Sequence, residues 1–145
     1  TWLNKWGTWD YYTFNMKSTR SITTNRTSYT QLGGTWNESR FKISGYKGGK
    51  KNFRVNSTEK IKLNTDFVTE EESVWFEQLI NSPEVYVLEG FQTDISASIY
   101  SLLNNYVQPA RVTNSSYIRK TIANDKLMQY TFEIEKSKIK RTQAI

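Results

Sequence analysis

Apolar and polar residues alternate along much of this chain, and this period-2 pattern predicts strands. The clearest stretch covers residues 128–135, where Met128, Tyr130, Phe132 and Ile134 alternate with polar residues. Such a strand has one buried face and one solvent-exposed face. Less regular alternation predicts a long strand or hairpin over 9–30 and further strands over 40–44, 52–63, 85–88 and 111–122.

The second predicted hairpin has a glycine-rich turn at residues 45–49. Its apolar side chains, Phe41, Ile43 and Phe53 among them, are expected to face the core. Residues 90–109 are the least readable part of the chain, because apolar positions at helical spacing are mixed with Ser, Thr and Asn. We predict a loop there, with a possible helix.

The best local signal in the chain is a helix start at Thr69. Its hydroxyl can accept a hydrogen bond from the backbone of Glu72, whose side chain can reach back, and three consecutive acids favour the positive end of the helix dipole. Pro83 ends the segment, so we predict a helix over 70–81 whose anchor is Trp75. The residues expected to anchor the fold are Thr69, Trp75, Leu79, Tyr130 and Phe132.

These elements predict a mostly β protein, a β-sandwich or barrel-like domain with one flanking helix. A length of 145 residues suits a single structural module spanning 1–145. Only 37% of the residues are hydrophobic, but 5 Trp, 9 Tyr and 7 Phe each bury a large area. We therefore expect a folded, soluble domain without a membrane span.

The composition excludes several kinds of chemistry, because the chain has no Cys and no His. Disulfides, the usual zinc sites, Ser-His-Asp triads and imidazole acid–base catalysis all need one of these residues. Paired carboxylates remain formally open as glycosidase-type acids, but nothing in the sequence pairs any two of Asp10, Glu59, Asp66, Asp94 and Asp125. We predict no catalytic, metal-binding or cofactor-binding residues, and hence no enzyme.

Charge is unevenly distributed along the chain. Residues 1–63 carry a net charge of +9, residues 64–94 carry −8 and residues 95–145 carry +5. The acidic block can be a solvated face, or it can dock head to tail on the basic surface of a neighbouring copy. Contact with nucleic acid would instead use the gathered basic side chains.

Trp2, Trp6 and Trp9 lie within eight residues of one another. Exposed tryptophans on a β scaffold can stack on sugar rings, whereas buried ones serve packing or a protein interface. The candidate interface combines these three residues with the basic ones: Trp2, Trp6, Trp9, Lys47, Lys50, Lys51, Lys136, Lys138, Lys140 and Arg141.

Residues 3–14, 69–86, 112–117 and 124–135 together resemble modules in virion proteins of tailed bacteriophages, crAss-like phages among them. The likeness departs at residues 90–109. It implies a non-enzymatic structural component of the virion, part of a tail, ring or hub, whose partners are other copies of itself and neighbouring virion proteins. The alternative is a carbohydrate-binding β-sandwich module of a receptor-recognising protein.

Overall fold

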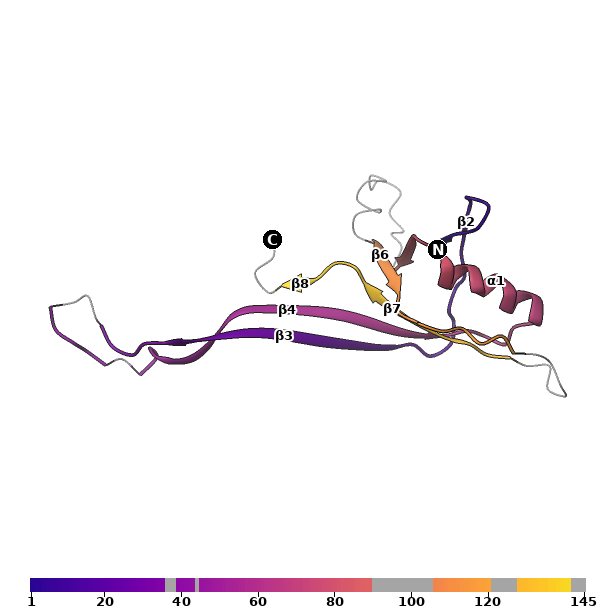
Figure 1. The fold of residues 1–145 in the computed structure, drawn as a ribbon. Coiled ribbons are helices and arrows are strands. Elements are labelled where there is room, and N and C mark those ends of the chain that lie inside the picture. Colours follow the sequence, from indigo (N-terminus) through magenta and orange to yellow (C-terminus); the bar gives the residue numbers. More distant parts are fainter. Residues whose placement is uncertain (36–38, 44, 90–105, 121–127, 142–145) are drawn as a thin grey trace, which may run out of the picture. The chain divides into compact units, whose positions relative to one another are not determined.

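The computed structural model describes residues 1–35, 39–43, 45–89, 106–120 and 128–141 (Figure 1). Within these residues the chain forms one helix, α1 (Glu70–Asn81), and eight strands. The strands are β1 (Trp2–Leu3), β2 (Trp9–Asp10), β3 (Thr19–Gln31), β4 (Gly49–Asn64), β5 (Val85–Leu88), β6 (Val107–Val112), β7 (Thr131–Lys136) and β8 (Lys140–Arg141).

The eight strands belong to one antiparallel sheet, in the order β2-β1-β5-β6-β7-β4-β3, with β8 also paired to β4. Registers such as Ile61 opposite Ile134 and Val85 opposite Ala110 fix the central part of the sheet. The predicted mostly β class with one flanking helix is confirmed. Among the described residues, β2 and β3 end the strand order without pairing to each other, so the sheet is not closed into a barrel.

The chain divides into two compact units. Unit 1 comprises Thr1–Ile22 and Thr58–Ile139, and unit 2 comprises Thr23–Ser57 and Lys140–Ile145. The boundary falls inside β3 and β4, so each of these long strands contributes to both units.

The core of unit 1 consists of aromatic and aliphatic side chains from the sheet, from α1 and from the N-terminal segment. Phe76 is fully buried, while Trp2 and Phe132 each expose only 1% of their surface. The predicted buried face of the last strand region is confirmed, since Met128, Tyr130, Phe132 and Ile134 are all buried. Aromatic contacts join the layers, with Phe76 and Phe132 ring centroids 5.4 Å apart.

Helix α1 begins and ends where the sequence predicts. The Thr69 hydroxyl accepts from the Glu72 backbone N–H at 3.3 Å, and the Glu72 carboxylate accepts from the Thr69 N–H at 2.8 Å. These two bonds satisfy donors that the first helical turn leaves open. Phe76 and Leu79 are buried, whereas Trp75 is only half-buried and its indole N–H donates to Asp10 at 2.9 Å. Phe76 therefore replaces Trp75 as the deepest anchor of the helix.

The predicted strand or hairpin over 9–30 divides in the structure. β2 is short, β3 begins only at Thr19, and the intervening segment has no strand. Tyr12 and Phe14 of that segment pack on the core instead, with the Tyr12 ring 4.9 Å from Phe76 and the Phe14 ring 6.1 Å from Phe132. Their two-residue spacing correctly predicts that the two rings share one face. The rings pack on core side chains, however, and their backbone pairs with no strand.

Two further strand predictions differ from the structure. The described residues of 40–44 form no strand, and Phe41 and Ile43 expose 57% and 82% of their surface. The strand predicted over 111–122 is β6, which ends at Val112 and begins at Val107, inside the segment predicted as a loop. Most of that loop, residues 90–105, lies outside the described residues.

Candidate functional site

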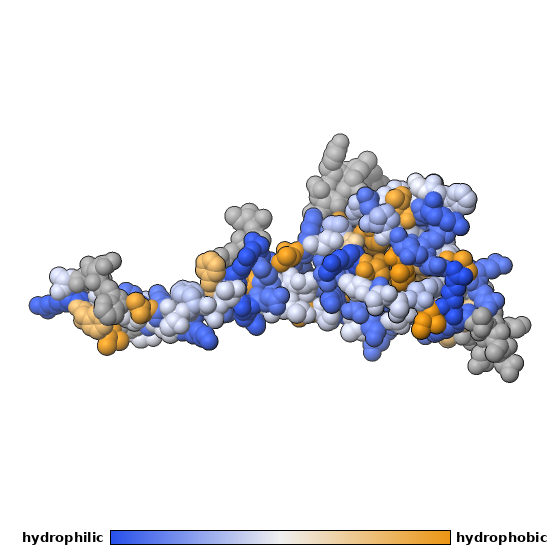
Figure 2. Space-filling view, in the orientation of Figure 1, coloured by the Kyte–Doolittle hydropathy of each residue, from blue (hydrophilic) through white to orange (hydrophobic). Residues whose placement is uncertain are grey.

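Unit 2 has no core of its own among the residues that the structure describes. Each of its described residues is exposed or half-buried, and none is buried. Hydrophobic side chains lie on the surface of this part of the chain (Figure 2). The large exposed ones are Tyr29 (46% exposed), Leu32 (72%), Phe41 (57%), Ile43 (82%), Tyr46 (78%) and Phe53 (76%).

The two faces of β4 within unit 2 differ in chemistry. Successive side chains of a strand point to opposite faces, so Phe53 and Val55 share one face. The other face carries only polar and basic side chains: Lys50, Asn52, Arg54 and Asn56. The Phe53 face also carries Lys51, so the alternation separates a mixed apolar and basic face from a face that is polar and basic only.

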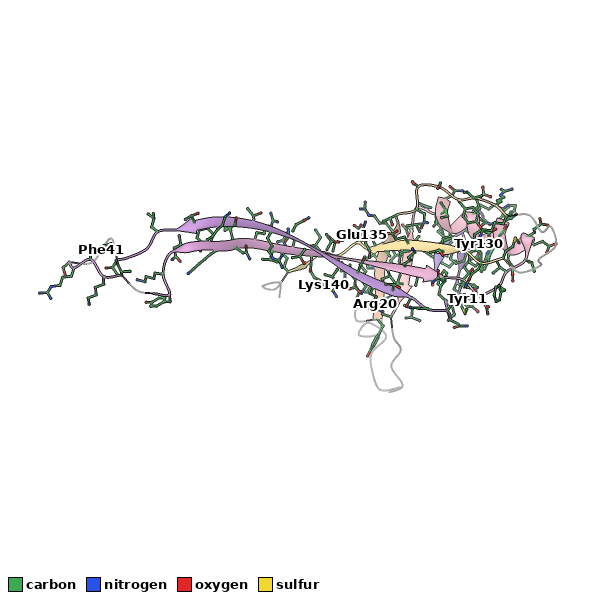
Figure 3. The ribbon with its side chains drawn as sticks, turned by 90° about the horizontal axis from the view of Figure 1, so that it is seen from below. Tyr11, Arg20, Phe41, Tyr130, Glu135 and Lys140 are labelled. Atoms are coloured by element: carbon green, nitrogen blue, oxygen red, sulfur yellow. The ribbon has the colours of Figure 1, made fainter. Side chains whose placement is uncertain are left out.

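Strand β8 brings the C-terminal bases to β4 (Figure 3). Arg141 is the Cα partner of Asn56, and Lys140 is the partner of Ser57. Residues directly opposite each other in an antiparallel pair project from the same face. Arg141 therefore joins the Arg54 face, and Lys140 lies on the Phe53 face.

The loop that joins β3 to β4 has a defined local geometry at Phe41 (Figure 3). Gly34 has a φ of +87°, and a Cβ at this position would clash with the Phe41 ring. The Thr35 hydroxyl donates to the Arg40 carbonyl at 3.0 Å and accepts from the Lys42 N–H at 2.9 Å. Only glycine suits position 34, for its backbone angle and for the approach of the ring.

The structure distributes the predicted interface residues over both units. Lys47, Lys50, Lys51, Lys140 and Arg141 belong to unit 2, while the three tryptophans, Lys136 and Lys138 belong to unit 1. Trp6, Trp9 and Lys138 are exposed. Trp2 and Lys136 are buried, so the structure corrects their assignment to a surface.

Lys136 is buried because it closes an ion-pair cluster in unit 1. Its Nζ lies 3.1 Å from a Glu59 carboxylate oxygen and 2.5 Å from a Glu89 carboxylate oxygen. Arg20 contacts the same two carboxylates, at 3.3 and 3.5 Å. Two cations and two anions balance, and the buried carboxylate of Glu59 is compensated. Lys136 therefore ends β7 as a packed residue and is not part of an exposed interface.

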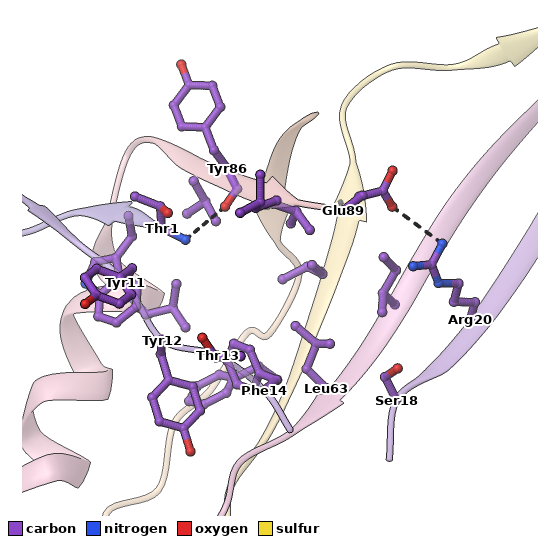
Figure 4. Close-up of a pocket in the computed structure, with 18 residues that line it drawn as sticks. Thr1, Tyr11, Tyr12, Thr13, Phe14, Ser18, Arg20, Leu63, Tyr86 and Glu89 are labelled. Atoms are coloured by element: carbon purple, nitrogen blue, oxygen red, sulfur yellow. Dashed lines mark hydrogen bonds and ion pairs between the residues drawn. The ribbon is translucent and has the colours of Figure 1, made fainter. Parts of the chain in front are cut away.

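A pocket of about 440 Å³ opens on unit 1 beside this cluster (Figure 4). Apolar side chains of the sheet, Leu63 and Phe132 among them, form its wall, and Tyr11 is exposed at its edge. The ion pair between Arg20 and Glu89 borders it (Figure 4). Its volume falls within the range of small-molecule sites, but Arg20 and Glu89 pair with each other and the Thr1 ammonium donates to the Tyr86 carbonyl.

The exposed aromatics of unit 1 lie near polar side chains. Trp6 exposes 78% of its surface, and the Lys5 ammonium lies 5.3 Å from its ring centre. Trp9 exposes 49% and contacts Tyr86 edge to face, with ring centroids 5.6 Å apart. Asn4 donates to Asp10 at 3.2 Å in the same region. Flat rings beside hydrogen-bonding groups are the elements of a sugar-binding surface.

The candidate carboxylates lie in separate settings. Glu59 is in the ion-pair cluster, Asp10 accepts from Trp75 and Asn4, and Asp66 is exposed and accepts from the Phe67 N–H. Asp94 and Asp125 lie outside the described residues. Within the described part of the chain, no group of three or more Asp and Glu side chains is placed to hold a metal ion. In the same part, no helix has the length and apolar character that crossing a membrane requires.

Sequence reasoning missed Arg54 and the exposure of Phe53. Both residues were placed in a predicted strand whose apolar side chains should face a core. The signal was present in the alternation of residues 50–56, but alternation does not tell whether an apolar face packs inside its own unit. Compared with known proteins, the chain matches no family model, no curated protein and no solved structure.

Proposed function

We propose that this protein is a non-enzymatic structural subunit of a bacteriophage virion, part of a tail, ring or hub, that assembles through its unit 2. The observation that carries the proposal is the absence of any buried residue among the described residues of unit 2. The resemblance of four sequence segments to phage virion modules supports the setting.

A ribbon of strands without a core is marginally stable in water. Covering its apolar side chains would contribute about 25 cal/mol per Å² of apolar surface removed from water. Phe53, Ile43 and Tyr46 each expose more than three quarters of their surface, so a large gain is available. Exposed apolar surface on this scale is typical of a protein–protein interface.

Charge favours a second copy of the chain as the neighbour. Unit 2 contains nine Lys and Arg and one Glu, for a net charge of +8. Unit 1 contains eleven Lys and Arg and thirteen Asp and Glu, for a net charge of −2. Unit 2 of one copy and unit 1 of the next are therefore complementary, and a contact between unlike surfaces generates a ring or a tube.

The test is the oligomeric state of the chain by native mass spectrometry and light scattering over a concentration series. Phe53→Ser should reduce the oligomeric fraction. Ile118→Ser is the matched control, because Ile118 is also 76% exposed but belongs to unit 1. A chain that stays monomeric at every concentration and salt, or equal effects of the two substitutions, would contradict the proposal.

The exposed aromatics of unit 1 favour carbohydrate binding as a second candidate. Trp6 and Tyr11 expose 78% and 76% of their surface, and Trp9 lies against Tyr86. Glycan-array binding that is lost in Trp6→Ala and Tyr11→Ala would support this function. Retention of binding in both variants, or no binding by the wild type, would contradict it.

A further inference from the structure

We propose that the basic face of unit 2, formed by Lys50, Arg54 and Arg141, binds the phosphate backbone of double-stranded DNA. This function uses the opposite face of β4 from Phe53, but it draws on the same positive charge of unit 2 as the assembly proposal. The two functions are compatible in a subunit that contacts a neighbour on one face of the ribbon and DNA on the other.

The first support is the gathering of positive charge. Segments 23–57 and 140–145 are far apart in the sequence, and together they hold nine of the twenty Lys and Arg and one of the fourteen acids. Clustered Lys and Arg on one surface are the electrostatic footprint of a nucleic-acid-binding protein.

The second support is that Lys50, Arg54 and Arg141 form no salt bridge with another described residue. In every salt bridge between described residues, both partners belong to unit 1. Lys50, Arg54 and Arg141 are exposed and take part in none of them. Their charge is therefore available to an external anion.

The third support is the register of β8 on β4. Because Arg141 pairs with Asn56, its side chain projects from the face that carries Arg54, two residues along the strand. Lys50 is on the same face four residues farther along. A strand advances about 3.3 Å per residue, so the basic groups are spread along the ribbon, as contacts to a phosphate backbone would require.

The composition of this face favours duplex DNA over a single strand. Its β4 side chains between Lys50 and Asn56 include no aromatic ring. Proteins that hold single strands use aromatic rings on which the bases stack, whereas a duplex offers regularly spaced phosphates, and its major groove admits a β-ribbon. The polar Asn52 and Asn56 can add hydrogen bonds to phosphate oxygens.

The experiment measures binding of a fluorescently labelled duplex by the full chain, using fluorescence anisotropy between about 50 and about 200 mM salt. The test variant is Lys50→Gln/Arg54→Gln/Arg141→Gln. The matched control is Lys5→Gln/Lys17→Gln/Lys62→Gln, which removes the same charge from exposed positions of unit 1. A single strand of the same sequence serves as the second ligand.

We expect the test variant to lose more than about tenfold in duplex affinity at low salt, and its salt dependence to weaken by about 2.7 in log K against log salt, since each phosphate contact contributes about 0.9. The control variant should keep the wild-type slope. No binding at low salt, an equal loss in both variants, or a preference for the single strand would overturn the proposal.

If instead the test variant abolishes oligomers and the wild type does not bind DNA, the basic face belongs to the contact between copies. Conversely, a Phe53→Ser monomer that still binds duplex would separate this inference from the assembly proposal.

Discussion

Unit 1 and unit 2 share the strands β3 and β4 but bury very different amounts of side chain. Every buried residue in the described part of the chain belongs to unit 1, where Trp2, Phe76 and Phe132 are almost inaccessible. Unit 2 has strands of the same alternating kind, and its Phe53 is 76% exposed. The comparison teaches that alternation identifies a strand and its two faces, whereas burial depends on what another element or another molecule places against them.

The sharpest way to break this comparison is to remove one phenylalanine from each unit. Phe76→Ala should destabilise the chain by about 3–5 kcal/mol, because it leaves a cavity in a core that excludes water. Phe53→Ala should change the stability of the monomer by less than about 0.5 kcal/mol. Urea unfolding at low protein concentration measures both values, and equal losses would mean that unit 2 has a core after all.

The second prediction concerns the buried charge of unit 1. Lys136→Met should cost about 3–5 kcal/mol, because it leaves the buried Glu59 carboxylate without its closest cation. Lys138→Met, at an exposed position two residues away, should have little effect. Adding Glu59→Leu to Lys136→Met should recover part of the loss. If the two lysine variants unfold alike, the ion-pair cluster does not stabilise unit 1.

The third prediction distinguishes a structural acidic segment from a functional one. Thr69→Ala removes the capping box of α1 and should cost about 1 kcal/mol in thermal or urea unfolding. Glu71→Gln should cost only a few tenths of a kcal/mol, because Glu71 acts on the helix dipole alone. A Glu71→Gln variant that loses a measured activity while its melting temperature is unchanged would make this segment a site.

The fourth prediction concerns the dependence of stability on pH. Burial, reinforced by the neighbouring Tyr130, raises the pKa of Tyr117 well above its ordinary value, and its hydroxyl donates to the Ser73 carbonyl of α1 at 2.6 Å. The folded state holds the Tyr117 proton more tightly than the unfolded state does. The contribution of Tyr117 to the free energy of unfolding is therefore complete below about pH 9 and falls as the pH rises above about 10. Tyr117→Phe should lose about 1 kcal/mol at neutral pH and show a weaker decline at high pH.

The control for this prediction is Tyr11→Phe, since Tyr11 is 76% exposed. Its unfolding free energy should follow the wild-type pH dependence. Parallel curves for the wild type and Tyr117→Phe up to high pH would contradict a role of Tyr117 in the decline.

Local interactions made α1 predictable from the sequence. Its start depends on Thr69 and Glu72, three residues apart, and its end on Pro83. The helical stripe was less informative, because Trp75 and Phe76 are adjacent and the sequence does not tell which of them points to the sheet. The Asp10 carboxylate accepts a hydrogen bond from the Trp75 indole N–H. This bond holds the Trp75 ring at the boundary of the core and leaves Phe76 to point to the sheet.

Contacts between distant residues were not predictable. The sequence places Lys136 among the candidate interface residues, and its burial depends on Glu59, which is 77 positions away. The basic face of unit 2 likewise depends on the pairing of Arg141 with Asn56. The alternation of residues 50–56 puts Arg54 and Phe53 on different faces of β4, but only the β8 register shows which face the C-terminal bases join.

The ion-pair cluster also favours one register of β4 and β7 during folding. In the register that places Lys60 opposite Glu135, Lys136 stands opposite Glu59. A slip of one residue would turn the apolar side chains of β7 to the wrong face, and a slip of two would bring either Ile134 or Lys138 opposite Glu59 in place of Lys136. The slip of one residue and the slip toward Ile134 are therefore both penalised, the first by exposing the apolar face of β7 and the second by leaving the buried Glu59 carboxylate opposite an apolar side chain.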